Sequence, residues 1–394
     1  MDRSEYSTLA AALAAVPDPR KARGKRHPWP LILTLLGAAL LSGERSVRGI
    51  GQWVTERAEE LCALLQPPRG RLPSVATLRR ALRDVDVVAL ERQVAAFAQG
   101  LPSPADAAAP PAPAGAPPPA APTWVGQAVD GKAVRGANRH GAAVHLVSLV
   151  RHADAAVLGQ RRVAAKSNAI TAVPALLASR DLTGTVTTMD ALLTQRALAA
   201  QIRRQGGHSL MVVKENQPEL HAALHRLFTE PPPPLPSDCA ETYTATEKGH
   251  GRVETRTLER SAALTGYLDW PGVGQVARRT YRAVERTTGV VRTEVTYGVT
   301  SLGPREASAA EVEALWRGHW TIENRAHYVR DVSMGEDAGQ QRAGHIPQAL
   351  AALRNGVLSL LRSRGWANVA DALRHYGAYA ARALGLLGAL PARL

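Results

Sequence analysis

Gln127-Ala128-Val129-Asp130-Gly131-Lys132 carries an apolar run into a carboxylate, and Val186-Thr187-Thr188-Met189-Asp190-Ala191 repeats the pattern further along the chain. Each run predicts a strand with an aspartate at its end. Ligands of open α/β sheets bind beyond the carboxyl ends of strands. If the two strands are neighbours, Asp130 and Asp190 converge, and the repulsion between their charges favours a bound cation. Oxygen ligands of this kind suit Mg²⁺ or Mn²⁺. For either aspartate alone, a loop cap or a salt bridge is the alternative.

The pattern around these two runs predicts an α/β fold. Residues 123–230 show three strands, then helix, strand, helix, strand and helix, which is the element order of an RNase H-like core with a mixed sheet. The predicted strands are 124–129, 145–151, 157–164, 184–189 and 209–213, and the predicted helices are 170–180, 193–205 and 218–228.

Residues 231–305 interrupt this core. The proline run at 231–234 and the β-rich segments 252–258, 274–285 and 290–299 predict an inserted antiparallel subdomain. Helical pattern resumes where Ser308 and Glu311 have capping-box spacing. Residues 306–394 therefore complete the core and add apolar helices at 346–362 and 369–387.

The first hundred residues predict a small helical domain, separated from the core by a Pro/Ala-rich linker at 101–122. Residues 18–26 form a basic loop with five cations, and Arg79 and Arg80 lie on one side of a helix that opens near Ser74. Short helices with basic patches suit a helix-turn-helix-like DNA-binding module. A helical dimerisation domain with a solvated charged face is the alternative.

Composition narrows the functional class. The formal net charge of +14 favours a partner rich in phosphate, and only six of the 48 cationic residues are lysine, although codon bias could explain that preference. Two cysteines exclude a disulfide framework and a thiolate zinc cluster. The polar start predicts no signal peptide, and the apolar run at 31–41 is too short to span a bilayer, so we expect a cytosolic protein.

The stretch from His319 to Asp331 predicts one helix in which a carboxylate, histidines and arginines alternate with apolar residues. Burying a carboxylate without a partner is costly, so Glu323 needs an explanation. A third carboxylate from a late helix would complete the metal site begun by Asp130 and Asp190.

Taken together, these motifs resemble the ISAs1 group of IS4-like DDE transposases, the H-repeat-associated proteins, over nearly the whole chain. The resemblance rests on several short motifs that occur in the same order: Val16–Arg20, Pro73–Arg80, Ala128–Lys132 with Arg135-Gly136, Thr188–Ala191 with Gln195, Val213–Gln217, His250–Arg256, and the helix at 319–331 extended to Asp337.

The resemblance implies metal-dependent DNA cleavage at transposon ends and strand transfer, on an RNase H-like fold with a β-rich insertion. It gives Asp130, Asp190 and Glu323 the catalytic, metal-binding roles, with two Mg²⁺ or Mn²⁺ ions. The substrate is double-stranded DNA, namely terminal repeats and target, and paired ends favour a homodimer. The expected location is the cytoplasm of a bacterium, in association with the nucleoid, and no membrane is involved.

Related transposases place Tyr, Arg, Glu and Lys along the last helix, and here those positions hold Trp316, His319, Glu323 and Arg330. Spacings of three, four and seven return to one helix face. This predicts that His319 and Arg330 contact DNA phosphates beside the metal site, with Asn324 as a further candidate.

Two further motifs supply candidate DNA contacts. Lys214, Asn216 and Gln217 could orient DNA or the Asp190 loop, with simple turn chemistry as the alternative.

His250, Arg252 and Arg256 could grip a DNA end from the insertion, with a surface β-turn as the alternative. The roles of Asp331, Glu336 and Asp337 stay open among support for the metal ligands, rival metal ligands and a solvated helix end.

Two other functions remain open: a transposase-derived DNA-binding protein that no longer cuts, and a structure-specific nuclease on the same fold. The presence of three carboxylates favours an enzyme. A nucleotide-binding α/β enzyme is disfavoured, because no Gly-rich loop with phosphate-cradle spacing follows a strand.

Overall fold

The computed structural model describes residues 6–102, 124–139, 142–164, 168–231, 233, 238–249 and 251–390. Packing divides them into two compact units. The first holds the described residues within Met1–Pro119, Gly131–Ala172 and Thr321–Leu394, and the second those within Ala120–Asp130 and Val173–Trp320. This division differs from the predicted boundaries, because the helices of residues 1–100 pack in one unit with C-terminal helices. Most of the predicted linker lies outside the described residues.

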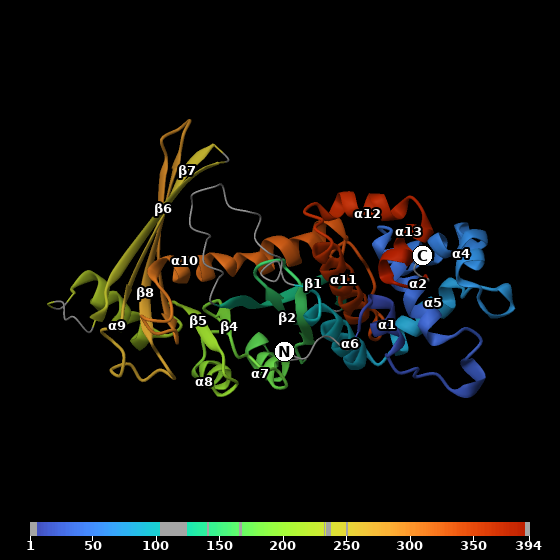
Figure 1. Ribbon diagram of the computed structural model, residues 1–394, viewed down its shortest axis with the longest axis horizontal. Helices are drawn as coiled ribbons and strands as arrows, with labels where there is room; N and C mark the ends of the chain where they lie inside the picture. The colour runs from blue at the N-terminus through green and yellow to red at the C-terminus, as the bar shows by residue number, and fades with distance from the viewer. Residues whose placement is uncertain are drawn as a thin grey trace, which may run out of the picture. The chain divides into compact units, whose positions relative to one another are not determined.

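Helices dominate the first unit (Figure 1). Its N-terminal helices are α1 (Leu9–Ala14), α2 (Trp29–Leu41), α3 (Val47–Glu56), α4 (Ala58–Leu65), α5 (Val75–Asp84) and α6 (Val87–Gln99). Its C-terminal helices are α11 (Ile346–Ser363), α12 (Val369–Gly377) and α13 (Ala380–Leu387). Helix α2 is buried along nearly its whole length, as its continuous apolar sequence predicts. Helices α1, α11 and α13 pack against it.

The strands form one mixed sheet in the order β3-β2-β1-β4-β5-β9-β8-β7-β6. Its core elements are β1 (Val125–Arg139), β2 (Ala142–Arg151), β3 (Val157–Arg162), α7 (Ala169–Leu177), β4 (Thr185–Met189), α8 (Arg196–Arg204), β5 (His208–Val213) and α9 (Pro218–Thr229). Strands β1, β4 and β5 run parallel, whereas β3 is antiparallel to β2. The predicted RNase H-like order and mixed sheet are confirmed.

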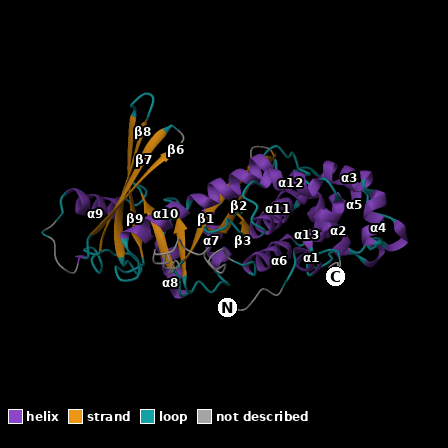
Figure 2. Cartoon of the chain, turned by 45° about the horizontal axis from the view of Figure 1, so that its top comes forward, coloured by secondary structure: helices purple, strands orange, loops and turns teal. Residues whose placement is uncertain are grey.

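The predicted insertion continues this sheet and is not a separate layer. Its strands are β6 (Glu241–Gly249), β7 (Arg252–Ser261), β8 (Gln275–Glu285) and β9 (Val291–Thr300), each antiparallel to the next, and β9 pairs with β5. Figures 1 and 2 show that their outer ends extend as a long ribbon beyond α9 and α10 (Ala309–Gly318). The sequence pattern identified β7, β8 and β9 but missed β6, whose side chains are almost all exposed and polar.

The core of the second unit lies between the sheet and α10. Trp316 and Leu315 of the helix join Val186, Leu210 and Leu258 of three strands in one buried cluster. The predicted capping box between Ser308 and Glu311 starts α10.

Gly298 is required by this packing, because a Cβ there would lie 2.5 Å from the Trp316 ring. The residue at the tyrosine position of the related pattern is therefore a core residue here.

Candidate active site

The two aspartates follow paired positions on neighbouring parallel strands. Val129 of β1 is the register partner of Met189 of β4, and the next residues are Asp130 and Asp190. Neighbouring strands lie about 4.8 Å apart, so the two residues lie side by side where the pairing of β1 with β4 ends. Both are partly exposed. The two strands are neighbours, which is the condition set above for Asp130 and Asp190 to approach each other, and two carboxylates of this kind have the oxygen-donor chemistry that Mg²⁺ and Mn²⁺ require.

The local chain differs at the two positions. Strand β4 ends at Met189, and the Asp190 loop is fixed because Oδ1 of Asp190 accepts a hydrogen bond from the backbone N–H of Leu193 at 3.0 Å. Strand β1 does not end at Asp130, as expected from the sequence, but continues to Arg139. Asp130 is the point at which β1 leaves its pairing with β4.

Two polar residues of the motif after β5 support the Asp190 loop. The side-chain amide of Asn216 donates to the Ala191 carbonyl at 2.7 Å, and that of Gln217 donates to the Thr194 carbonyl at 2.9 Å. Of the two roles predicted for them, the structure favours orientation of the loop over contact with DNA. Lys214 is exposed and stays a candidate for DNA contact.

His319 directly follows α10 and lies beside β4. Its Nδ1 is 3.0 Å from Oγ1 of Thr188, whose hydroxyl donates to the Gln127 carbonyl at 3.2 Å. A hydroxyl has one hydrogen, so Nδ1 of His319 acts as the donor in this contact. Burial lowers the pKa of His319, although the Asp190 charge and the Thr188 backbone oppose the shift. The imidazole is therefore neutral near pH 7, which argues against a direct role as a cation for phosphate.

Glu323 is exposed on a helical turn of unusual geometry. The predicted single α-helix gives way to π-helical turns over Ile322–His327 and Val329–Ser333. Such i→i+5 turns occur frequently at functional sites. Asn324 is exposed beside Glu323, which keeps both residues as candidates.

Arg330 does not share the exposed face of Glu323, because the wider π-helical turns change the phase of the helix. Its side chain is 1% exposed and lies 2.6 Å from Glu336, which is also 3.3 Å from Arg354. This burial argues against the predicted phosphate contact of Arg330. Burial alone would raise the pKa of Glu336, but the two guanidinium groups hold it below its usual range. Glu336 is therefore an ion-pair partner and not a rival metal ligand.

Lys132 forms ion pairs with the other two members of the acidic cluster. Its buried ammonium lies 2.6 Å from Asp331 and 3.7 Å from Asp337. Burial raises the pKa of Asp331, while Lys132 opposes that shift. The contacts tie the outer half of β1 to the turn after the π-helical segment.

Gly136 permits this close approach, because a Cβ there would meet the Gly339 carbonyl oxygen at 2.1 Å. The motif Ala128–Lys132 with Arg135-Gly136 therefore includes residues with a structural role, such as Lys132 and Gly136. The sequence could not distinguish them from catalytic residues.

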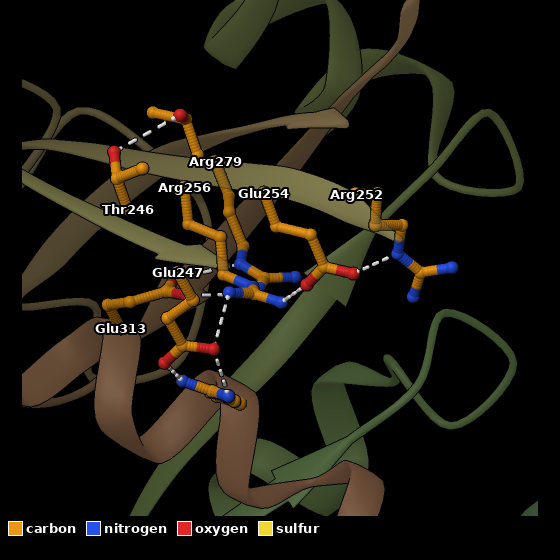
Figure 3. Close-up of polar contacts among 9 residues, drawn as sticks. Thr246, Glu247, Arg252, Glu254, Arg256, Arg279 and Glu313 are labelled. Carbon is orange, nitrogen blue, oxygen red and sulfur yellow. Dashed lines mark hydrogen bonds and ion pairs between the residues drawn. The ribbon is translucent and has the colours of Figure 1, made fainter. Parts of the chain in front are cut away.

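Two arginines of the motif predicted on the insertion, Arg252 and Arg256 of β7, lie in a network of ion pairs (Figure 3). Arg256 is 11% exposed and pairs with Glu254 and Glu247, and Glu247 also accepts from Arg317 of α10 at 2.8 Å. These pairs fasten β6 and β7 to α10, and they argue against the predicted DNA contact of Arg256. Nothing in the sequence connected Glu247 to Arg317, which are 70 residues apart.

Arg252 pairs with Glu254 but stays about half exposed, so it stays a candidate for DNA contact. Beside this network, Arg279 and buried Glu313 of α10 form two hydrogen bonds of 2.8 and 2.9 Å. The predicted contact of His250 lies outside the described residues.

Arg79 and Arg80 are exposed on α5, whose buried face consists of Leu78, Ala81 and Leu82. Their exposure leaves both arginines accessible to a phosphate-bearing partner, and the predicted DNA contact stays a prediction.

The full metal site remains a prediction. Asp130 and Asp190 belong to the second unit and Glu323 to the first. Within the described residues, no three His, Cys, Asp or Glu side chains are grouped closely enough to hold a metal ion. In the same part of the chain, no helix is both long and apolar enough to cross a membrane.

Comparison with known proteins gives a consistent result. Residues 121–346 match the family described as "Transposase DDE domain", and residues 10–98 match the one described as "DDE_Tnp_1-associated". "Putative transposase YncI" of Escherichia coli O157:H7 is 28% identical, over 90% of this chain and 87% of its own length. "H repeat-associated putative transposase YhhI" of Escherichia coli K12 is 30% identical, over 59% of this chain and 63% of its own. "Uncharacterized protein in dhlA 3'region" of Xanthobacter autotrophicus is 35% identical, over 66% of this chain and 83% of its own length.

Proposed function

Because the chain belongs to the DDE transposase family, we propose that it cuts DNA at the ends of a mobile element and joins the freed ends to new DNA. The observation that carries the proposal is the register of β1 and β4, which brings Asp130 and Asp190 to adjacent positions. The proposed catalytic set is Asp130, Asp190 and Glu323, the last taken from its place in the family pattern.

These three carboxylates would hold one or two Mg²⁺ or Mn²⁺ ions. When bound, the ions would activate water for in-line attack on a phosphodiester and stabilise the leaving 3′ oxygen. The protein supplies no covalent nucleophile in this scheme. The freed 3′-hydroxyl of the DNA then attacks a second phosphodiester.

Neighbouring residues position the carboxylates. The hydrogen bonds from Asn216 and Gln217 hold the loop that carries Asp190. His319 fixes the end of α10 against Thr188, and its lowered pKa keeps it uncharged beside Asp190. These contacts limit the freedom of the site before DNA binds, which favours catalysis.

The DNA is held by charge on exposed surfaces. Candidates that stay exposed are Arg79, Arg80, Lys214, Arg252 and Asn324. The net charge of +14 supports a polyanionic partner. We propose a homodimer on paired ends, to be measured by light scattering with and without DNA.

The test is incubation of the full chain with its flanking genomic DNA and Mg²⁺ or Mn²⁺, followed by mapping of the cut ends. Asp130→Asn, Asp190→Asn and Glu323→Gln should each abolish cleavage and leave DNA affinity unchanged. Glu219→Gln, an exposed carboxylate at the start of α9, is the matched control and should cut normally. Metal-dependent cutting by any of the three variants would remove that residue from the site.

Strand-transfer products separate the transposase from a nuclease on the same fold. Cut ends without joined products would favour the nuclease. Binding without cuts in the unaltered protein would favour a silent DNA-binding descendant.

A further inference from the structure

A cationic cavity of about 340 Å³ lies in the first unit, and none of the residues proposed above as catalytic or DNA-binding lines it. It opens between the loop that precedes α2 and the turn Pro68–Gly70. Its walls carry one carboxylate, Asp18, and four cations: Arg20, Lys25, Arg26 and Arg69. The volume falls within the range of small-ligand sites, about 300–1,000 Å³.

One side of this cavity is preorganised. Arg20 donates to both carboxylate oxygens of Asp18, at 2.8 and 3.0 Å, and to the His27 carbonyl at 2.8 Å. Its guanidinium carbon also lies 5.2 Å from the centre of the Trp29 ring. The hydrogen bond from Arg20 lowers the pKa of Asp18, so this carboxylate is charged and paired with Arg20 and, more loosely, with Lys25. A ligand that enters therefore meets a wall already fixed in place.

Of the other three cations, Lys25 lies 3.6 Å from Asp18, and the two arginines have no counter-charge in the described part of the chain. Arg26 and Arg69 are exposed, and neither has an ion-pair partner among the described residues. Arg69 has a φ of 64°, in the left-handed region that a non-glycine residue rarely adopts. Strain of this kind costs about 1–3 kcal/mol and gathers at functional sites. Here the strained turn brings an unpaired guanidinium to the cavity.

Helix α2 also begins at Trp29, and its N-cap residue, Pro28, forms no side-chain cap. The positive end of a helix attracts anions. Cations and an uncapped helix start thus meet at one cavity.

We propose that this cavity binds a backbone phosphate of DNA. A phosphodiester presents charged acceptor oxygens, which arginine guanidinium groups bind with charge-assisted hydrogen bonds. The inference rests on the proposed function only in taking DNA as the ligand, and it adds a contact point in the helical region to those proposed above. Because the contact reads phosphate and not base edges, it anchors DNA without regard to sequence.

The test compares the full chain with the double variant Arg26→Gln/Arg69→Gly in binding to a short fluorescein-labelled duplex of mixed sequence across a KCl series. Glycine tolerates the left-handed backbone at Arg69, so the fold should be retained, and thermal unfolding checks this. We expect affinity to fall on the order of ten-fold, and the slope of log K against log salt to weaken by about 0.9 for each phosphate that the variant no longer binds. Arg48→Gln, exposed on α3 and outside the cavity, is the matched control and should change neither quantity.

Unchanged affinity and slope in a folded double variant would overturn the proposal. Calorimetry with inorganic phosphate forms the second arm. Loss of phosphate binding with unchanged DNA affinity would assign the cavity to a free phosphate and also overturn it. Cleavage is measured separately, so failure of the carboxylate assignments leaves this result readable.

Discussion

Oγ1 of Thr188 and Nδ1 of His319 lie 3.0 Å apart, and this contact joins the penultimate residue of β4 to the residue that follows α10. The Thr188 hydroxyl donates onward to the Gln127 carbonyl on β1. One short chain of hydrogen bonds thus links the two strands that carry Asp130 and Asp190 to the helix that leads toward Glu323.

Thr188→Val should break this chain while keeping the side-chain shape. Loss of a partner for buried polar groups costs about 1–3 kcal/mol. We expect about that loss in the free energy of unfolding, and cleavage slowed on the order of ten-fold with DNA affinity unchanged. Nitrogen NMR of the imidazole would show a changed tautomer balance. Thr188→Ser retains the hydroxyl and should retain the spectrum; a valine variant with the original spectrum and rate would contradict this account.

Glu91 should make stability depend on pH. It is buried on α6 and accepts hydrogen bonds from Gln160 at 2.8 Å and Gln348 at 2.9 Å, and burial raises its pKa from 4.5 to about 7. A carboxyl whose pKa is raised in the folded state stabilises the fold below its unfolded pKa, and this contribution is lost as pH rises through about 7. The expected loss is about 3 kcal/mol.

Denaturant unfolding at about pH 5 and about pH 8 measures this dependence. Glu91→Gln removes the titrating group, so its profile should be flatter than that of the unaltered protein by the same amount. Parallel profiles would show that Glu91 does not ionise in this range.

Glu336→Gln should destabilise the first unit strongly. The change leaves the buried guanidinium groups of Arg330 and Arg354 without their counter-charge. Removing one partner of a buried pair costs about 3–5 kcal/mol. Asp371→Asn, which breaks a mostly exposed pair with Arg374, is the control and should cost less than about 1 kcal/mol in the same denaturation assay. Equal losses in the two variants would mean that the Glu336 pair is not buried in solution.

Gly136→Ala and Gly385→Ala should change stability in opposite directions. A Cβ at Gly136 would lie 2.1 Å from the Gly339 carbonyl oxygen, whereas one at Gly385 in α13 meets nothing within 4 Å. Overpacking costs about 1–3 kcal/mol, and alanine in an open helix position gains about 0.5–1 kcal/mol over glycine. Thermal unfolding of both variants gives the comparison; a neutral Gly136→Ala would mean that β1 and the 337–339 turn do not approach closely.

Local pattern was enough to predict much of the fold. Alternating and continuous apolar runs gave most of the core strands and helices, because side-chain periodicity reflects which face is buried. The adjacency of β1 and β4 was only a condition in the sequence argument, and the structure meets it. Strand β6 was not predicted, because almost all of its side chains are exposed and no buried face produces an apolar alternation in the sequence. The π-helical turns around Glu323 were not predicted, because the residue types there do not indicate a change in the backbone hydrogen-bond pattern.

Within the candidate site, sequence reasoning could propose residues but could not decide their partners. The pattern of apolar runs that lead into Asp130 and Asp190 indicates a cation site, and the family resemblance supplies most of the support for Glu323 as its third carboxylate. Arg256 and Arg330 were predicted as DNA contacts and are instead used in ion pairs within the protein. The sequence does not show which carboxylate, if any, an arginine will pair with.

The sequence by itself determined most of the element order, the net charge and the place of Asp190 directly after its strand, since these follow from residue types and from residues close together in the chain. Only the tertiary structure decided which charges are used inside the protein. Lys132 meets Asp331 across 199 positions, and Arg330 is buried against Glu336 and Arg354. Whether a guanidinium is free for DNA depends on burial and on the distance to a carboxylate, and both arise only when distant segments pack together.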